Sequence, residues 1–136
     1  MLNLEIPHSI FEQMLAQARA EAPIEACGIL AGKNGTVEKF YKMTNADQSN
    51  DHFMMEPEEQ FKVAKDIRAA GHQMLAIYHS HPETPARPSV EDIRLAFMPD
   101  VIYVITSLQN EDYPSVKGFL INNGNVEEIA VKILEQ

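Results

Sequence analysis

The segment QMLAIYHSH at 73–81 constrains the fold more than any other part of the chain. It is a continuous, largely apolar run, preceded by a glycine and followed by a proline-rich stretch. Such a run is typical of a strand that is buried on both faces and lies in the middle of a sheet. The sequence therefore predicts an α/β domain built around this strand.

Hydrophobic periodicity and turn residues predict the other elements of this domain. Apolar residues at helical spacing indicate helices, and extended runs around Asn-Gly turns indicate hairpins. Helices are expected over 9–22, 56–71 and 89–97, another buried strand over 101–108, and hairpins over 25–43 and 115–134. The polar stretch 44–55 has no period and is interpreted as a loop. The result is a mixed central sheet flanked by about three helices, in one domain over 1–136.

Two details of the helices can also be predicted. Ser9 followed by Glu12 fits a capping box at the start of the first helix. In the second helix, Phe61, Ala64 and Ile67 fall on one stripe and are expected to face inward.

Charge and cysteine content restrict the partners and the compartment. The formal net charge of −9 argues against nucleic acid or an anionic membrane as a partner. No apolar run approaches the roughly 20 residues that span a bilayer, and no secretory signal is visible at the N-terminus. The only cysteine, Cys27, lies in an apolar run and is expected to be a small buried side chain. A lone cysteine fits a reducing compartment, so a cytoplasmic location is expected.

Two histidines stand at the end of the central strand. Side chains alternate along a strand, so His79 and His81 share one face while Ser80 points to the other. Ligands of open α/β sheets usually bind where strands give way to loops. Two imidazoles so placed can converge on one metal ion, although the pair alone is equally typical of ordinary polar residues at a strand end.

The loop PETPARP that follows delivers two further polar residues to a fixed place. Its three prolines leave few conformations, and it leads to Ser89 and Asp92. Ser89 with an acid three residues later also fits a helix N-cap, and this structural role is compatible with Asp92 facing a metal. Two histidines and one carboxylate are the protein ligands of a catalytic zinc site, although Fe²⁺, Mn²⁺ or Co²⁺ would also fit.

Hydrolysis at such a site needs a general base and a donor for the oxyanion. Ser89 could donate to the oxyanion. Candidate bases are Glu21, Glu25, Glu83 and Glu91, and spacing alone does not choose among them. An acid at the head of a strand, where Glu25 lies, is more often simply solvated.

The sequence HSHPETPARPSVED resembles the JAMM motif of the JAMM/MPN-plus zinc metalloproteases, in which His-x-His is followed by seven residues, Ser, two residues and Asp. Every defining position of that motif is filled. PIEACGILAG is similar to the first-strand segment that carries the family's catalytic Glu, and FMMEPEEQF resembles the start of its second helix. The resemblance extends from about residue 6 to residue 107.

The resemblance implies an MPN domain, similar in architecture to the cytidine deaminases, that cleaves a peptide or isopeptide bond. It implies that one Zn²⁺ is bound by His79, His81 and Asp92, that Glu25 activates water, and that Ser89 steadies the tetrahedral intermediate. The short chain is similar to prokaryotic members that act on ubiquitin-like or sulfur-carrier proteins. The implied partner has an extended C-terminal tail, which would pair with a sheet edge.

Two alternative functions make different demands on the sequence. MPN domains without the ligand set serve as non-catalytic protein-binding scaffolds, and metal content would separate that role from catalysis. A zinc deaminase needs His-x-Glu with Pro-Cys-x-x-Cys, which a chain with one cysteine does not have. No pattern indicates the number of subunits.

Overall fold

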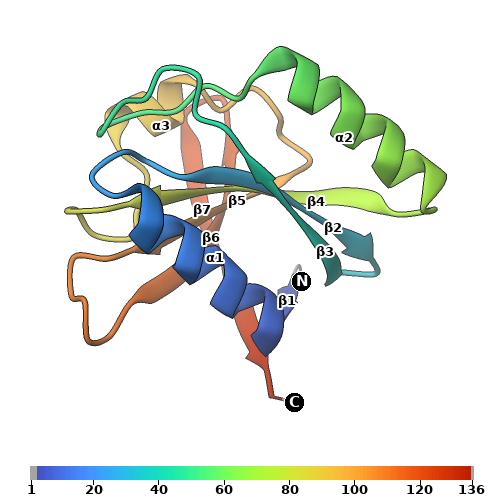
Figure 1. The fold of residues 1–136 in the computed structure, drawn as a ribbon, viewed down its shortest axis with the longest axis horizontal. Coiled ribbons are helices and arrows are strands. Elements are labelled where there is room, and N and C mark those ends of the chain that lie inside the picture. The colour runs from blue at the N-terminus through green and yellow to red at the C-terminus, as the bar shows by residue number, and fades with distance from the viewer. Residues whose placement is uncertain (1–2, 136) are drawn as a thin grey trace.

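The structure is a computed structural model that describes residues 3–135, which form seven strands and three helices (Figure 1). In chain order the elements are β1 (Asn3–Pro7), α1 (His8–Glu21), β2 (Cys27–Lys33), β3 (Thr36–Met43), α2 (Pro57–Ala69), β4 (Gln73–His81), α3 (Val90–Arg94), β5 (Ile102–Ser107), β6 (Ser115–Asn122) and β7 (Asn125–Leu134). The strands close into a barrel in the order β1-β3-β2-β4-β5-β6-β7.

The predicted mixed sheet is confirmed, with β4 in its middle (Figure 1). β4 pairs antiparallel with β2 and parallel with β5, so both of its edges are occupied. The barrel closes through β1, which pairs parallel with β7 and meets β3 at Glu5 and Thr36. β1 was not predicted, because its alternation of buried Leu4 and Ile6 with more exposed residues extends over only five positions.

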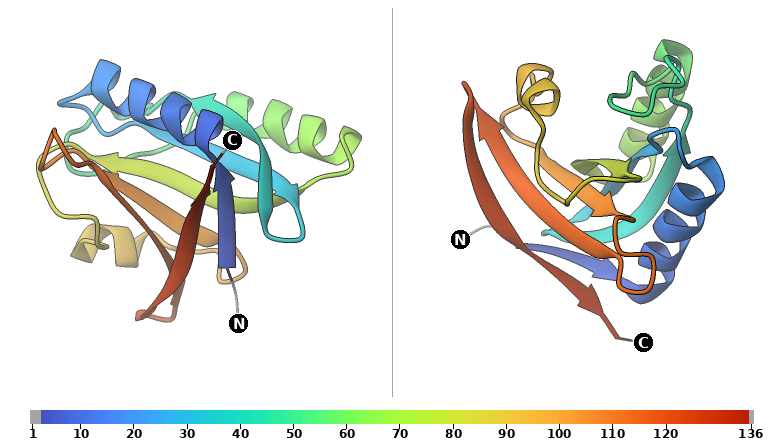
Figure 2. Two further views of the ribbon diagram at one scale, coloured as in Figure 1. Left: turned by 90° about the horizontal axis from the view of Figure 1, so that it is seen from below. Right: turned by 90° about the vertical axis from the view of Figure 1, so that its left-hand side faces the viewer.

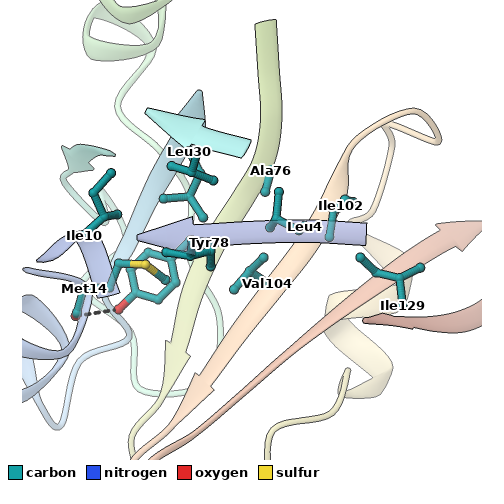
Figure 3. Packing of buried hydrophobic residues seen from close by; sticks show 11 residues of the cluster. Leu4, Ile10, Met14, Leu30, Ala76, Tyr78, Ile102, Val104 and Ile129 are labelled. Carbon is teal, nitrogen blue, oxygen red and sulfur yellow. Dashed lines mark hydrogen bonds between the residues drawn. The ribbon is translucent and has the colours of Figure 1, made fainter. Parts of the chain in front are cut away.

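The main core lies inside the barrel and beneath α1 (Figure 3). Leu4, Met14 and Tyr78 are each fully buried there. The Tyr78 hydroxyl donates a hydrogen bond of 3.0 Å to the carbonyl of Met14 and so joins β4 to α1. This packing fixes the strand that carries both histidines relative to the rest of the barrel.

The capping box predicted for the first helix is wrong. α1 begins at His8 with Pro7 as its N-cap, and no side chain caps it. Because β1 runs directly into Pro7, the helix starts earlier than the Ser9 pattern suggested. Glu12 instead lies 3.2 Å from the ring of His8, on the exposed helix surface.

The inward stripe of the second helix is only partly confirmed. Ile67 is buried, but Phe61 is 66% exposed, with the Lys65 ammonium 5.1 Å from its ring centre. Figure 2 shows α1 and α2 along one side of the barrel and α3 on the other. α3 is shorter than expected and ends at Arg94. None of the helices within residues 3–135 is long and apolar enough to cross a membrane.

Candidate metal centre

The two histidines at the end of β4 meet on one face, as predicted. His79 and His81 are buried, and their Nε2 atoms lie 3.1 Å apart. Ser80 points to the opposite face, where its hydroxyl accepts a hydrogen bond of 2.8 Å from the amide of Ala26. The residue between the histidines therefore fastens β4 to the residue that precedes β2.

The proline-rich loop also sets the tautomer of one histidine. The ring Nδ1 of His81 lies 2.8 Å from the carbonyl of Pro85. Because a carbonyl can only accept, Nδ1 carries the proton and Nε2 presents a lone pair. The loop is held in place by the Ser107 hydroxyl, which donates to the carbonyl of Thr84. The loop thus orients a candidate ligand in addition to carrying Asp92.

Asp92 serves two purposes with one carboxylate. Its Oδ2 accepts a hydrogen bond of 3.0 Å from the amide of Ser89, whose hydroxyl accepts one from the amide of Asp92. This is the predicted capping box at the start of α3. The same Oδ2 lies 2.9 Å from Nε2 of His81 and 3.2 Å from Nε2 of His79. The helix cap therefore aims the carboxylate at both imidazoles.

These three atoms fit a small cation. Their separations of 2.9, 3.1 and 3.2 Å are close to the roughly 3.4 Å between N and O ligands of a tetrahedral zinc ion with bonds of about 2.0–2.1 Å. Burial lowers the pKa of His79 and keeps its imidazole neutral, as ligation requires. Burial would raise the pKa of Asp92, but hydrogen bonds with both histidines hold it far below its ordinary value.

A proton and a metal ion compete for the Nε2 atom of His81. Burial lowers the pKa of His81, but its bonds with Asp92 and the Pro85 carbonyl outweigh burial and raise that pKa. In the metal-free protein, Nε2 of His81 therefore takes up a second ring proton beside the Asp92 carboxylate more readily than an ordinary imidazole does. A metal ion bound at the same three atoms would release that proton.

The structure brings Glu25, alone among the four candidate bases, to this site. Cys27 pairs with His79 in the β2–β4 register, and the Ala26–Ser80 hydrogen bonds extend it, so Glu25 lies opposite His81 on the same face. Glu25 is 3% exposed, so the expectation of a solvated strand end is wrong. The rivals are less suitable: Glu21 is the last residue of α1, Glu83 is exposed, and the Glu91 carboxylate is paired with Arg94.

The Glu25 carboxyl is suited to exchange a proton near neutral pH. Its Oε1 is buried and has no hydrogen-bond partner among the described residues. Burial raises the pKa of Glu25 from 4.5 to about 7, although nearby His81 opposes the shift. A carboxyl of this kind can take a proton from water and return it to a leaving group. Cys27, by contrast, is fully buried as predicted, and burial raises its pKa to about 12.

This shift predicts that Glu25→Gln stabilises the metal-free protein at alkaline pH. Below pH 4.5 Glu25 is protonated both folded and unfolded, so the two proteins should be equally stable. Between pH 4.5 and about 7 only the unfolded chain ionises, so the wild type loses stability as pH rises. Above pH 7 the variant should be more stable by about 2–3 kcal/mol. Urea unfolding of metal-free protein from pH 4 to 9 measures this, and a constant difference would contradict it.

A cavity of about 300 Å³ adjoins the ligand atoms. Segment 44–56 and α3 lie on opposite sides of the end of β4 (Figure 2), and residues from both sides, such as Met54 and Phe97, line the cavity. The Phe53 ring stacks on the His79 imidazole with centres 4.7 Å apart. Because Nδ1 of His79 has no hydrogen-bond partner within residues 3–135, this stacking orients the ring. The three consecutive apolar residues FMM in an otherwise polar loop are the feature of the sequence that could have indicated this lining of the cavity.

Comparison with known proteins agrees with the geometry. The family model described as prokaryotic homologs of the JAB domain matches residues 7–117. The chain belongs to the prokaryotic JAB family. It is 37% identical over 135 residues to a CysO-cysteine peptidase of Mycobacterium tuberculosis, covering 98% of this chain and 92% of that protein. A probable TtuB-protein conjugate cleaving protease of Thermus thermophilus is 34% identical, with coverages of 98% and 84%.

Solved structures share the fold of this chain. A solution structure of a protein from Desulfitobacterium hafniense has a TM-score of 0.89 at 44% identity and covers 98% of this chain and 94% of that one. A JAB1/MPN domain protein from Archaeoglobus fulgidus has a TM-score of 0.63 at 20% identity, with coverages of 97% and 98%. The predicted MPN fold is therefore confirmed. Together with the His79, His81 and Asp92 cluster, the family makes this chain a JAMM-type metallopeptidase.

Proposed function

We propose that this JAB-family protein is a zinc peptidase that hydrolyses the bond joining the C-terminal tail of a ubiquitin-like or sulfur-carrier protein to an added residue or a conjugated protein. The observation that carries the proposal is the convergence of three ligand atoms beside a buried carboxyl, that of Glu25, whose Oε1 has no hydrogen-bond partner in the described part of the chain. The names of the relatives, a CysO-cysteine peptidase and a TtuB-protein conjugate cleaving protease, support this class of substrate.

The geometry supports a role for each residue of the site. His79, His81 and Asp92 would hold the zinc ion, which when bound supplies a Lewis acid for the scissile carbonyl and lowers the pKa of water to about 7. Glu25 takes the proton of the attacking water as its oxygen bonds to the carbonyl carbon. Glu25 then gives that proton to the leaving amine as the C–N bond breaks.

Ser89 can stabilise the oxyanion without giving up its role as a helix cap. Its oxygen accepts a hydrogen bond from the amide of Asp92, and this contact uses only a lone pair. A hydroxyl has one proton to donate as well as two lone pairs. The Ser89 proton is therefore available to the oxygen of the tetrahedral intermediate.

The substrate tail cannot pair with β4 in the way that a free sheet edge would allow, because β2 and β5 occupy both edges of that strand. The tail is better accommodated between segment 44–56 and α3, over the cavity beside His79. That passage is lined by Met54 and Phe97, both of which are more than half exposed. Their exposure is consistent with surfaces that a bound tail would cover.

The direct test uses candidate carrier proteins from the source organism. Zinc-loaded protein is incubated with its sulfur-carrier and ubiquitin-like proteins, each extended at the C-terminus by cysteine or a short peptide, or joined to a lysine side chain. Mass spectrometry should show loss of the added group at one defined bond, and chelated protein should leave every substrate intact. Failure to cleave any substrate would contradict the proposal.

Ser89→Ala should lower kcat by about 10²–10³-fold, because the oxyanion loses a donor. It should also lower stability by about 1 kcal/mol through loss of the N-cap. Ser89→Gly is the matched control, since glycine caps almost as well as serine but offers no hydroxyl. Both variants should lose the same activity although their unfolding free energies differ. Activity that instead follows stability would assign Ser89 to the cap alone.

A further inference from the structure

The second residue after β3 is a buried asparagine, Asn45, whose side-chain amide uses both its nitrogen and its oxygen in hydrogen bonds. Asn45 is 3% exposed. Its Nδ2 donates to the carbonyls of Glu25 and His52, at 3.1 and 3.0 Å. Its Oδ1 accepts from the amides of Asp47 and Met54, both at 3.1 Å. The Asn45 side chain therefore orders segment 46–54 through its hydrogen bonds, much as backbone hydrogen bonds order a strand within a sheet.

The contacts require an amide at this position. Two partners are carbonyls, which can only accept, and two are backbone N–H groups, which can only donate. This fixes the orientation of the Asn45 amide and matches its two donors and two acceptor lone pairs. A carboxylate in the same place would set an oxygen against the carbonyls of Glu25 and His52, and an apolar side chain would leave all four groups unsatisfied.

The backbone of Glu25 is held from two directions. Its N–H donates a hydrogen bond of 2.9 Å to the carbonyl of Ser49, and its carbonyl accepts one from Asn45, so Asn45 and segment 46–54 hold the backbone on both sides of its Cα. The next residue, Ala26, exchanges hydrogen bonds of 2.8 and 2.9 Å with Ser80 on the ligand strand. Because Glu25 lies outside β2, these contacts hold its backbone in place of the regular hydrogen bonds between paired strands.

The same segment packs on the metal site. Phe53, two residues before the Asn45–Met55 bridge closes, stacks on the imidazole of His79. Asn45 therefore connects the backbone of the candidate base with the segment that covers a candidate ligand. None of the hydrogen bonds that Asn45 makes within residues 3–135 goes to a ligand atom, so we expect it to influence chemistry through Glu25 and this segment.

We propose that Asn45 is a positioning residue for the Glu25 general base, and that its amide sets the distance of the Glu25 carboxyl from the reacting water. This inference rests on the proposed function and deepens it. Proton transfer is sensitive to displacements of about 1 Å, which can cost 10²-fold in rate. The effect should therefore fall on the chemical step and leave the binding of metal and substrate almost unchanged.

Asn45→Asp tests this, because it keeps the shape and the acceptor but removes both donors. We expect kcat to fall about 10–100-fold, with KM and the zinc dissociation constant within about threefold of wild type. Asn34→Asp is the matched control: it makes the same change of charge in the exposed turn between β2 and β3. It should leave all three quantities unaltered. Full kcat in Asn45→Asp, or a parallel loss of zinc affinity and rise in KM, would overturn the proposal.

Amide hydrogen exchange provides a readout that needs no turnover and no variant. In wild-type protein without metal, the N–H groups of Glu25 and Met54 should exchange slowly although neither lies in a named strand. Rapid exchange at both would overturn the positioning role, even if Asn45→Asp failed to fold. A wild-type protein that cleaves no substrate would contradict the proposed function instead, and the exchange data would still decide whether Asn45 fixes Glu25.

Discussion

Glu25→Gln is expected to lower kcat by about 10²–10⁴-fold while zinc remains bound. The amide has nearly the same shape as the carboxyl but cannot accept the proton of the attacking water. None of the three ligand atoms belongs to Glu25, so metal content should stay at the wild-type level. Steady-state kinetics on a cleavable tail, with metal analysis of the same samples, measures both quantities.

Two controls make this result specific. Glu83→Gln removes one negative charge from the exposed loop beside the ligands and should keep full activity. The expected gain in stability of Glu25→Gln at alkaline pH excludes misfolding as the cause of inactivity. If Glu25→Gln hydrolysed its substrate at the wild-type rate, the general base would have to be another group.

His81→Ala is expected to remove both zinc binding and activity. Zinc at about 1,000 times its dissociation constant should stabilise the wild-type protein by about 4 kcal/mol, because the ion binds only the folded state. The variant retains one imidazole and a carboxylate, and most of this gain should disappear. Denaturant unfolding with excess zinc or with chelator measures it.

His8→Ala is the appropriate control, since His8 is an exposed histidine on α1 far from the ligand cluster. It should show the full zinc-dependent gain in stability. The metal-free His81→Ala protein should also be less stable to denaturant than the metal-free wild type, because Asp92 loses a buried hydrogen-bond partner. An undiminished response of His81→Ala to zinc would place the metal elsewhere.

The parts of the site that are local in sequence could be predicted. Strand alternation alone puts His79 and His81 on one face, and the structure confirms it. The capping pattern of Ser89 and Asp92 is read directly from three-residue spacing and is present at α3. Such features depend on backbone geometry over a few residues, which sequence determines well.

Other parts of the site could not be predicted, because they depend on pairing between distant strands or on side chains in a segment that shows no hydrophobic periodicity. Spacing could not choose Glu25 among its rivals, because its place beside His81 follows from the register of β2 against β4. Asn45 and Phe53 lie in a segment that is ordered by individual side-chain contacts, so hydrophobic periodicity in the sequence does not identify them. The Phe61 prediction failed because helical spacing identifies a stripe and not the width of the surface that covers it.

The ligands and the base also differ in when they can come together. His79, His81 and Asp92 lie within one short stretch of chain, whereas Glu25 reaches them only through pairing between distant strands. Contacts of high sequence separation form slowly during folding, because a long loop must close first. We therefore expect the three ligand side chains to come together earlier in folding than Glu25 joins them, so that hydrolytic activity appears only after the barrel has closed around the reactive groups.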